Sequence, residues 1–246
     1  MFHMLNRRVL VLALLLGGLV LPGVGGCASA PLAPSADPSA MGASVEASKV
    51  YAPGPREKRY VDARSGKTQV RRFGKAAADG SWTMTSADAS VIDKEPKVGV
   101  AIQVLTFEPL SDGGVGLRDV IDYGENAITT YTPPLVLMPK VLGPEGWETS
   151  SRVRLTWASR PDEERSTGDA KLSLKIISAT GQGDERRVRL SQVLKISLPP
   201  ADVTEEELRE VGPKGIVSEQ ERRRVEVGFL TIQNESHDYT LQNETE

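Results

Sequence analysis

The chain has 246 residues, with 30 lysines and arginines against 33 aspartates and glutamates, and a single cysteine. This balance shows no concentrated basic footprint, so we expect no nucleic-acid partner. One cysteine excludes a disulfide framework within the chain and any metal centre built from several cysteines.

The first residues form a leader of the secretory type. Arg7 and Arg8 precede an apolar run from Val9 to Leu21, and small residues then lead to Cys27. The run has 13 residues, whereas a membrane-spanning helix needs about 20 apolar residues. The order of positive, apolar and small residues predicts a signal peptide over residues 1–26.

The end of this leader, Val24-Gly25-Gly26-Cys27, resembles the lipobox of bacterial lipoproteins. The resemblance implies that Cys27 is diacylated and becomes the first residue of the mature chain, and two or more acyl chains hold a protein stably at a membrane. Ala28 and Ser29 follow Cys27, so no aspartate stands in the second position of the mature chain. By resemblance to Gram-negative lipoproteins this implies the outer membrane, facing the periplasm. A cysteine that simply follows an ordinary secretory signal is the alternative.

Residues Ala28 to Lys49 are predicted to be a tether. Fifteen of these 22 residues are alanine, serine or proline, and little bulky apolar surface is present to offset the entropy cost of ordering. A flexible chain of this length reaches roughly 25 Å. We therefore expect residues 27–49 to hold a folded domain, residues 50–246, clear of the lipid headgroups.

From about Tyr51 onward, polar and apolar residues alternate in short segments. The clearest are Arg152–Trp157, Lys171–Ile176 and Arg187–Leu198. Period-two alternation buries one face of a strand and leaves the other in water. The pattern predicts an all-β fold with minor α content: one antiparallel sheet of about ten strands, strongly curved or closed into an incomplete barrel.

Glycine-containing connections between these segments predict hairpin turns at 63–66, 124–126 and 180–184. We expect one short helix, from Asp202 to Val211, in a connection between strands. Asp202 or Thr204 would cap a first turn rich in glutamate, and Gly212-Pro213 would end the helix.

Two segments match phosphate-binding loops only in part. Ser65-Gly66-Lys67-Thr68 has the end of a P-loop, but Val61 stands where that motif requires glycine. The glycine-rich segment 113–116 leads into a strand-like run rather than a helix. We interpret both as turns, and no cofactor is predicted.

His237 is the only histidine of the mature chain, so a zinc site with several histidines is excluded. Its neighbours Ser236 and Asp238 cannot form a catalytic triad with it, because adjacent strand residues point to opposite faces. We interpret His237 as a surface turn residue. A hydrolase would require it to be buried beside a serine or a carboxylate.

The other clusters of charged or aromatic residues are interpreted as structural. The acidic groups, Asp112, Asp119, Asp122, Glu125 and Asp162-Glu163-Glu164, do not follow the EF-hand pattern, and no carboxylate pair for glycoside hydrolysis can be recognised among them. We interpret Arg222-Arg223-Arg224 as a basic strand edge. We expect the three tryptophans, Trp82, Trp147 and Trp157, to fill the core; a sugar-stacking platform is the alternative.

A proline-flanked apolar segment, Tyr131–Pro139, leads to Gly146-Trp147, and Val227–Leu230 and Tyr239–Leu241 follow near the end. Together these segments resemble uncharacterised secreted and lipoprotein β-domains of bacteria, the TapB-like group. The resemblance spans about Tyr123 to Leu241, and it implies the β fold more than any activity.

The leading functional hypothesis is a lipid-anchored cell-envelope protein attached through Cys27, with a non-catalytic binding or structural β module of unassigned ligand. The alternative is a periplasmic carrier or chaperone for lipid or for another lipoprotein, with an apolar concave sheet face. This alternative depends on a fold-level analogy with half-barrel lipoprotein carriers. An envelope hydrolase is the third hypothesis.

Overall fold

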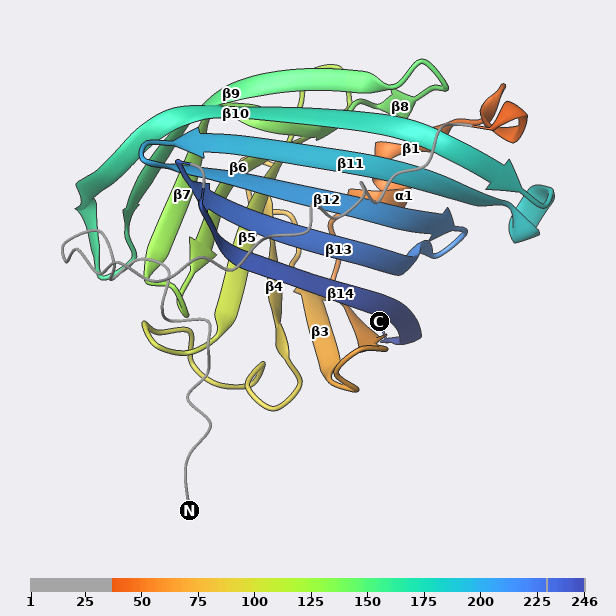
Figure 1. The fold of residues 1–246 in the computed structure, drawn as a ribbon. Helices are drawn as coiled ribbons and strands as arrows, with labels where there is room; N and C mark the ends of the chain where they lie inside the picture. Colours follow the sequence, from red (N-terminus) through yellow and green to blue (C-terminus); the bar gives the residue numbers. More distant parts are fainter. Residues whose placement is uncertain (1–36, 229, 246) are drawn as a thin grey trace.

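The computed structural model describes residues 37–228 and 230–245, in which twelve antiparallel strands close into a barrel (Figure 1). Strands that follow one another in the ring are consecutive in the chain apart from the short β8, and the ring closes where β14 pairs with β2. The barrel strands are β2 (Arg56–Asp62), β3 (Thr68–Phe73), β4 (Trp82–Asp88), β5 (Ile102–Pro109), β6 (Val115–Asp122), β7 (Ala127–Met138), β9 (Trp147–Trp157), β10 (Arg160–Thr180), β11 (Arg187–Leu198), β12 (Ala201–Gly212), β13 (Gly215–Val227) and β14 (Leu230–Thr245).

Five short elements complete the described fold. A two-residue strand β1 (Val45–Glu46) pairs with β8 (Val141–Leu142), outside the barrel sheet. Helix α1 (Ala47–Tyr51) follows β1 directly. The single-turn elements are η3 (Pro38–Ala40) and η4 (Gly183–Glu185). The described residues contain no helix that is long and apolar enough to cross a membrane.

The all-β antiparallel class is confirmed, but the expected number of strands and the incomplete closure were wrong. The expected helix from Asp202 to Val211 was also wrong, because this segment lies in strand β12. Residues 201–211 of β12 pair with β11, and the other edge of β12 pairs with β13. Hydrogen bonds to two neighbouring strands therefore override a glutamate-rich sequence that favours helix.

The predicted hairpin turns are confirmed. Residues 63–66 join β2 to β3, residues 124–126 join β6 to β7, and residues 180–184 lie between β10 and β11. Gly66 has φ 68° and Asn126 has φ 52°. Glycine and asparagine tolerate this left-handed conformation, which explains their presence at these two turns.

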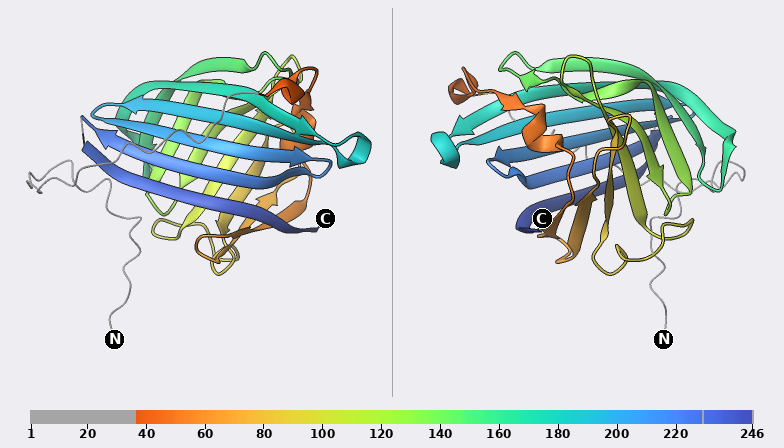
Figure 2. Two further views of the ribbon diagram at one scale, coloured as in Figure 1. Left: turned by 45° about the vertical axis from the view of Figure 1, so that its right-hand side comes forward. Right: turned by 180° about the vertical axis from the view of Figure 1, so that it is seen from behind.

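The barrel has two walls that cross one another. Figure 2 shows the long strands β10–β14 on one side and the strands β2–β7 running across them on the other. Inward-facing apolar side chains from both walls form one core cluster, including Leu172 and Leu194 from the long wall and Phe107 and Leu135 from the short wall. On β11 the cluster extends from Val188 to Ile196, which is most of the length of that strand.

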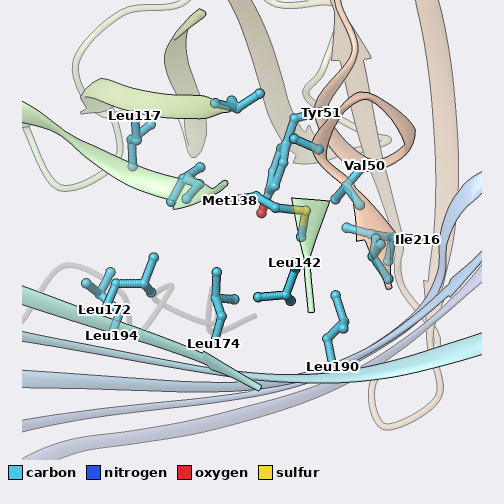
Figure 3. Close-up of a cluster of buried hydrophobic side chains, with 14 of the residues drawn as sticks. Val50, Tyr51, Leu117, Met138, Leu142, Leu172, Leu174, Leu190, Leu194 and Ile216 are labelled. Carbon is cyan, nitrogen blue, oxygen red and sulfur yellow. The ribbon is translucent and has the colours of Figure 1, made fainter. Parts of the chain in front are cut away.

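The segment before β2 adds to this apolar core. In Figure 3, Val50 and Tyr51 of α1 point toward Met138 and Leu142 inside the barrel. Alanines at three earlier positions are also buried: Ala40, Ala43 and Ala47. Residues 38–49, which composition assigns to the tether, therefore pack against the barrel, and we call residues 38–51 the plug.

Backbone hydrogen bonds fix the plug in place. The Asp37 N–H donates to the Ile177 carbonyl of β10 over 2.9 Å, and the Ala47 N–H donates to the Lys140 carbonyl over 3.0 Å. Small alanine side chains let the plug backbone lie close to these strands. The composition that favours a loose tether is thus equally suited to close packing.

Candidate functional site

Charged side chains fill the part of the barrel interior beside the apolar core. Three pairs across β12 and β13 carry them: Glu205 with Arg223, Glu207 with Glu221, and Arg209 with Glu219. The same alternation continues into apolar residues of the core at Val225 on β13 and Val211 on β12. Because alternate strand residues share a face, the charged residues face the interior with them.

The centre of this network is Glu219, whose side chain is 2% exposed. The Arg71 Nη2 of β3 donates to one carboxylate oxygen over 2.6 Å, and the Arg209 Nε donates to the other over 2.8 Å. Burial alone would raise the pKa of Glu219, but the two guanidinium groups lower it to about 2. Glu219 is therefore a carboxylate held between cations from opposite walls.

Arg209 connects this centre to the plug. Its Nη1 donates to the Tyr51 hydroxyl over 2.7 Å and to the Gln192 side-chain oxygen over 2.9 Å. Its Nη2 lies 2.6 Å from a Glu207 carboxylate oxygen. One guanidinium thus joins the plug to three neighbouring strands, β11, β12 and, through Glu219, β13.

Two further carboxyl groups in the network have raised pKa values. Burial raises the pKa of Glu207 to about 8, with Arg209 acting in the opposite direction and Glu219 in the same one. Burial also raises the pKa of Glu221 to about 7, and the neighbouring Glu219 and Glu205 contribute. The network therefore holds protons at neutral pH that exposed carboxyl groups would release.

A second set of ion pairs lies near the β6–β7 turn, away from the plug. Arg223 Nη1 is 3.2 Å from Glu125 of the β6–β7 turn, and Arg223 Nε is 3.3 Å from Glu205 of β12. Arg165 stacks over the Trp157 ring, 3.9 Å from its centroid, and donates to the Asn126 carbonyl over 3.3 Å. These contacts join the two walls.

His237 lies on β14 rather than in a turn, which corrects the sequence interpretation. Its Nδ1 is 3.2 Å from a carboxylate oxygen of the buried Asp62, and the Ser65 hydroxyl donates to the same oxygen over 2.6 Å. A serine hydrolase needs the histidine between the serine and the acid. Here the acid lies between them, so this set of three residues cannot activate the serine.

Asp62 has a structural explanation of its own. Its other oxygen accepts backbone hydrogen bonds from Asp238 and Arg64, over 3.0 and 3.1 Å. Burial would raise the pKa of Asp62, but the hydrogen bonds from Ser65, Asp238 and His237 hold it well below its usual range. Asp62 therefore anchors the β2–β3 turn to β14.

Three other sequence interpretations need correction. Arg222-Arg223-Arg224 is not a strand edge, because β13 is paired on both sides. Of the tryptophans, Trp82 is buried in the core as expected, but Trp147 is 38% exposed and Trp157 lies beneath Arg165. Those two tryptophans lie at the ends of β9, where the strand leaves the barrel core.

The remaining predicted sites lie apart from one another. Ser65–Thr68 and Gly113–Gly116 fall at hairpin turns, as expected. Asp119 accepts a hydrogen bond from Thr106, Asp122 accepts one from Gln103, and residues 162–164 are exposed on β10. Within residues 37–228 and 230–245, no group of histidine, cysteine, aspartate and glutamate side chains could hold a metal ion. Cys27 lies outside the described residues.

Sequence reasoning missed the interior charges, although the signal is present. Glu205, Glu207 and Arg209 alternate in register with Val203 and Val211. Charged residues at every second position, in step with flanking valines, face the interior together with those valines. This requires residues of opposite charge on other strands. Arg71, which supplies such a charge, lies 148 residues from Glu219.

The chain matches no protein-family model, no curated protein and no solved structure in comparisons with known proteins. Its resemblance to the TapB-like β-domains therefore stays a prediction.

Proposed function

We propose that the chain is a lipid-anchored cell-envelope protein, attached through Cys27, whose barrel is a non-catalytic structural or binding module. The observation that carries the proposal is the filled interior. Helix α1 packs into the apolar core, and the charged network lies beside that core. The barrel is thus a rigid body at the end of a lipid anchor.

The pairing of the interior charges supports a non-catalytic role. Glu219 is bound by Arg71 and Arg209, and Arg223 by Glu125 and Glu205. Catalytic acids, bases and nucleophiles must reach a substrate. Groups that neutralise one another across the barrel walls are better suited to holding the walls together.

The plug favours this module over a carrier of lipid. A carrier needs an apolar cavity for its cargo, whereas Val50 and Tyr51 already pack against Met138 and Leu142 in the apolar core. Cargo would have to displace Tyr51 and break its hydrogen bond to Arg209. We therefore expect no stoichiometric lipid inside the barrel.

Metabolic labelling tests the anchor. Cells that express the full chain in its native envelope are fed a labelled fatty acid, and the membrane fraction is compared with that from a Cys27→Ser variant. We expect the wild-type chain to be labelled and membrane-bound, and the variant to lose both properties. Retention of label and of membrane association by the variant would refute attachment through Cys27.

Native mass spectrometry of the lipidated protein, extracted from its own envelope, tests the module. We expect the mass of the chain with its covalent lipid, alone or with a bound envelope protein. A stoichiometric additional lipid that is not covalently attached would favour the carrier instead.

A further inference from the structure

Three large apolar side chains are exposed at the rim of the barrel where the plug enters. Met41 is 81% exposed, Val141 49% and Trp147 38%. We call these three residues the N-terminal rim. Met41 directly follows η3, Val141 is the first residue of β8, and Trp147 is the first residue of β9.

Hydrogen-bond partners place these segments together. Val45 of the plug pairs with Leu142 of β8, and Trp147 pairs with Leu174 of β10. The Ser39 hydroxyl of η3 accepts a hydrogen bond from the Ala179 N–H of β10 over 3.0 Å. Figures 1 and 2 show η3, β8 and the start of β9 at one end of the barrel.

The distance to the anchor is short at this end. Asp37, whose N–H is bound to β10 at Ile177, lies ten positions after Cys27 in the chain. Fully extended, ten residues span roughly 33–36 Å, and a flexible chain of that length has a root-mean-square reach of roughly 15–20 Å. A lipid on Cys27 would therefore hold the N-terminal rim close to the bilayer.

The opposite end of the barrel also exposes apolar side chains, Leu230 at 57% and Ile232 at 44%. From Ile177, eight residues of β10 lead to Asp169, which is roughly 26 Å along the strand. From Asp169 the path to Leu230 and Ile232 must also cross the width of β11, β12 and β13 to reach β14. Contact of that end with the bilayer would need a nearly extended tether, which costs chain entropy.

We propose that the N-terminal rim contacts the surface of the bilayer in which the Cys27 lipid is inserted, with Trp147 at the level of the headgroups. The inference rests on the proposed lipid attachment. Tryptophan is enriched at membrane interfaces because its ring is apolar and its N–H is polar. Around it, Lys140 and Lys175 are exposed beside Glu145 and Glu148, and lysine stems can lie along an apolar surface while the ammonium group stays in water.

Tryptophan quenching tests this contact. The full lipidated chain is reconstituted into phosphatidylcholine and phosphatidylglycerol vesicles whose phosphatidylcholine is brominated near the headgroup. We expect quenching of the wild-type fluorescence, loss of that quenching in Trp147→Phe, and its retention in Trp157→Phe. Equal quenching in wild type and Trp147→Phe would overturn the proposal.

A matched pair of double variants tests the rest of the surface. Met41→Ser with Val141→Ser should reduce the quenching of Trp147, and Leu230→Ser with Ile232→Ser should leave it unchanged, both with wild-type circular dichroism. If Cys27 carries the fatty-acid label but the tryptophan fluorescence is not quenched, the rim contact alone is overturned, and a protein partner at this surface is favoured. Absence of label on Cys27 would overturn the anchor, and with it this inference.

Discussion

The guanidinium group of Arg209 on β12 donates a hydrogen bond over 2.7 Å to the hydroxyl group of Tyr51 in helix α1. The same guanidinium contacts Glu219, which Arg71 reaches from the opposite wall. One side chain therefore takes part both in the docking of the plug and in the pairing of the interior charges. A change at Arg209 should affect both.

Replacing Arg209 by methionine should lower the free energy of unfolding by about 3–5 kcal/mol, because it removes the cation beside the buried Glu207 and one of the two cations that hold the buried Glu219. Urea unfolding of the mature chain with Cys27→Ser measures the effect. Arg152→Met is the matched control: its ion pair with Asp169 is exposed, so we expect a change within about 0.5 kcal/mol. Similar values for the two variants would contradict the role of Arg209.

Tyr51→Phe isolates the hydrogen bond between plug and network. A hydrogen bond to a charged group contributes about 1.5–3 kcal/mol, and a neutral one about 0.5–1.5 kcal/mol. Tyr60→Phe is the neutral comparison, because the Tyr60 hydroxyl donates to the Ile216 carbonyl over 3.1 Å. We expect Tyr51→Phe to be the more destabilising of the two in urea unfolding, and the reverse order would speak against the Arg209 contact.

The strands in which apolar residues alternate with polar ones, with the apolar residues facing the interior, were predictable from the sequence. Most apolar residues of Arg187–Leu198 stand at alternate positions. In the structure this segment is β11, which pairs with β10 and buries most of those side chains. Turn chemistry at Gly66 and Asn126 also predicted two hairpins correctly. In these segments, local propensity and the tertiary fold agree.

Strand β12 and the plug were not predictable in the same way. Glu205, Glu207 and Arg209 were read as part of a connecting helix. Partners of Glu205 and Arg209 lie on β11, on β13 and in the plug, and no local pattern indicates those partners. The alanines of the plug read as a tether, since composition does not show whether small side chains face water or a neighbouring strand. In both cases a contact that is distant in sequence decides the structure.

The raised pKa values of Glu207 and Glu221 predict that stability falls as pH rises. Near the ordinary carboxyl value of 4.5, the unfolded chain begins to release these protons while the folded chain keeps them. The folded state loses this advantage progressively up to about pH 7 for Glu221 and about pH 8 for Glu207. Glu219 acts in the opposite sense, because its lowered pKa removes stability as pH falls toward about 2.

Glu221→Gln tests the alkaline part of this profile, since glutamine resembles the protonated carboxyl group. We expect the variant to be more stable than wild type at alkaline pH, by roughly 1–3 kcal/mol, and equal to it in mild acid. Urea unfolding at a series of pH values measures the difference, with Glu163→Gln at an exposed position of β10 as control. A constant difference across pH would rule out titration of Glu221 as its cause.

Gly168 sets the close approach of β10 and β11. A Cβ atom at this position would lie 1.7 Å from the Ser197 carbonyl oxygen of β11, so an alanine must push the two backbones apart. We expect Gly168→Ala to cost roughly 2–3 kcal/mol, in the range of overpacked cores.

Gly99→Ala is the control, because nothing lies within 4 Å of its Cβ position and only its φ of +89° opposes a side chain. Such backbone strain costs about 1–2 kcal/mol, so thermal or urea unfolding should rank Gly168→Ala as the more damaging variant. If the two variants are equally stable, β10 and β11 have room to separate at Ser197, and the close approach does not require glycine.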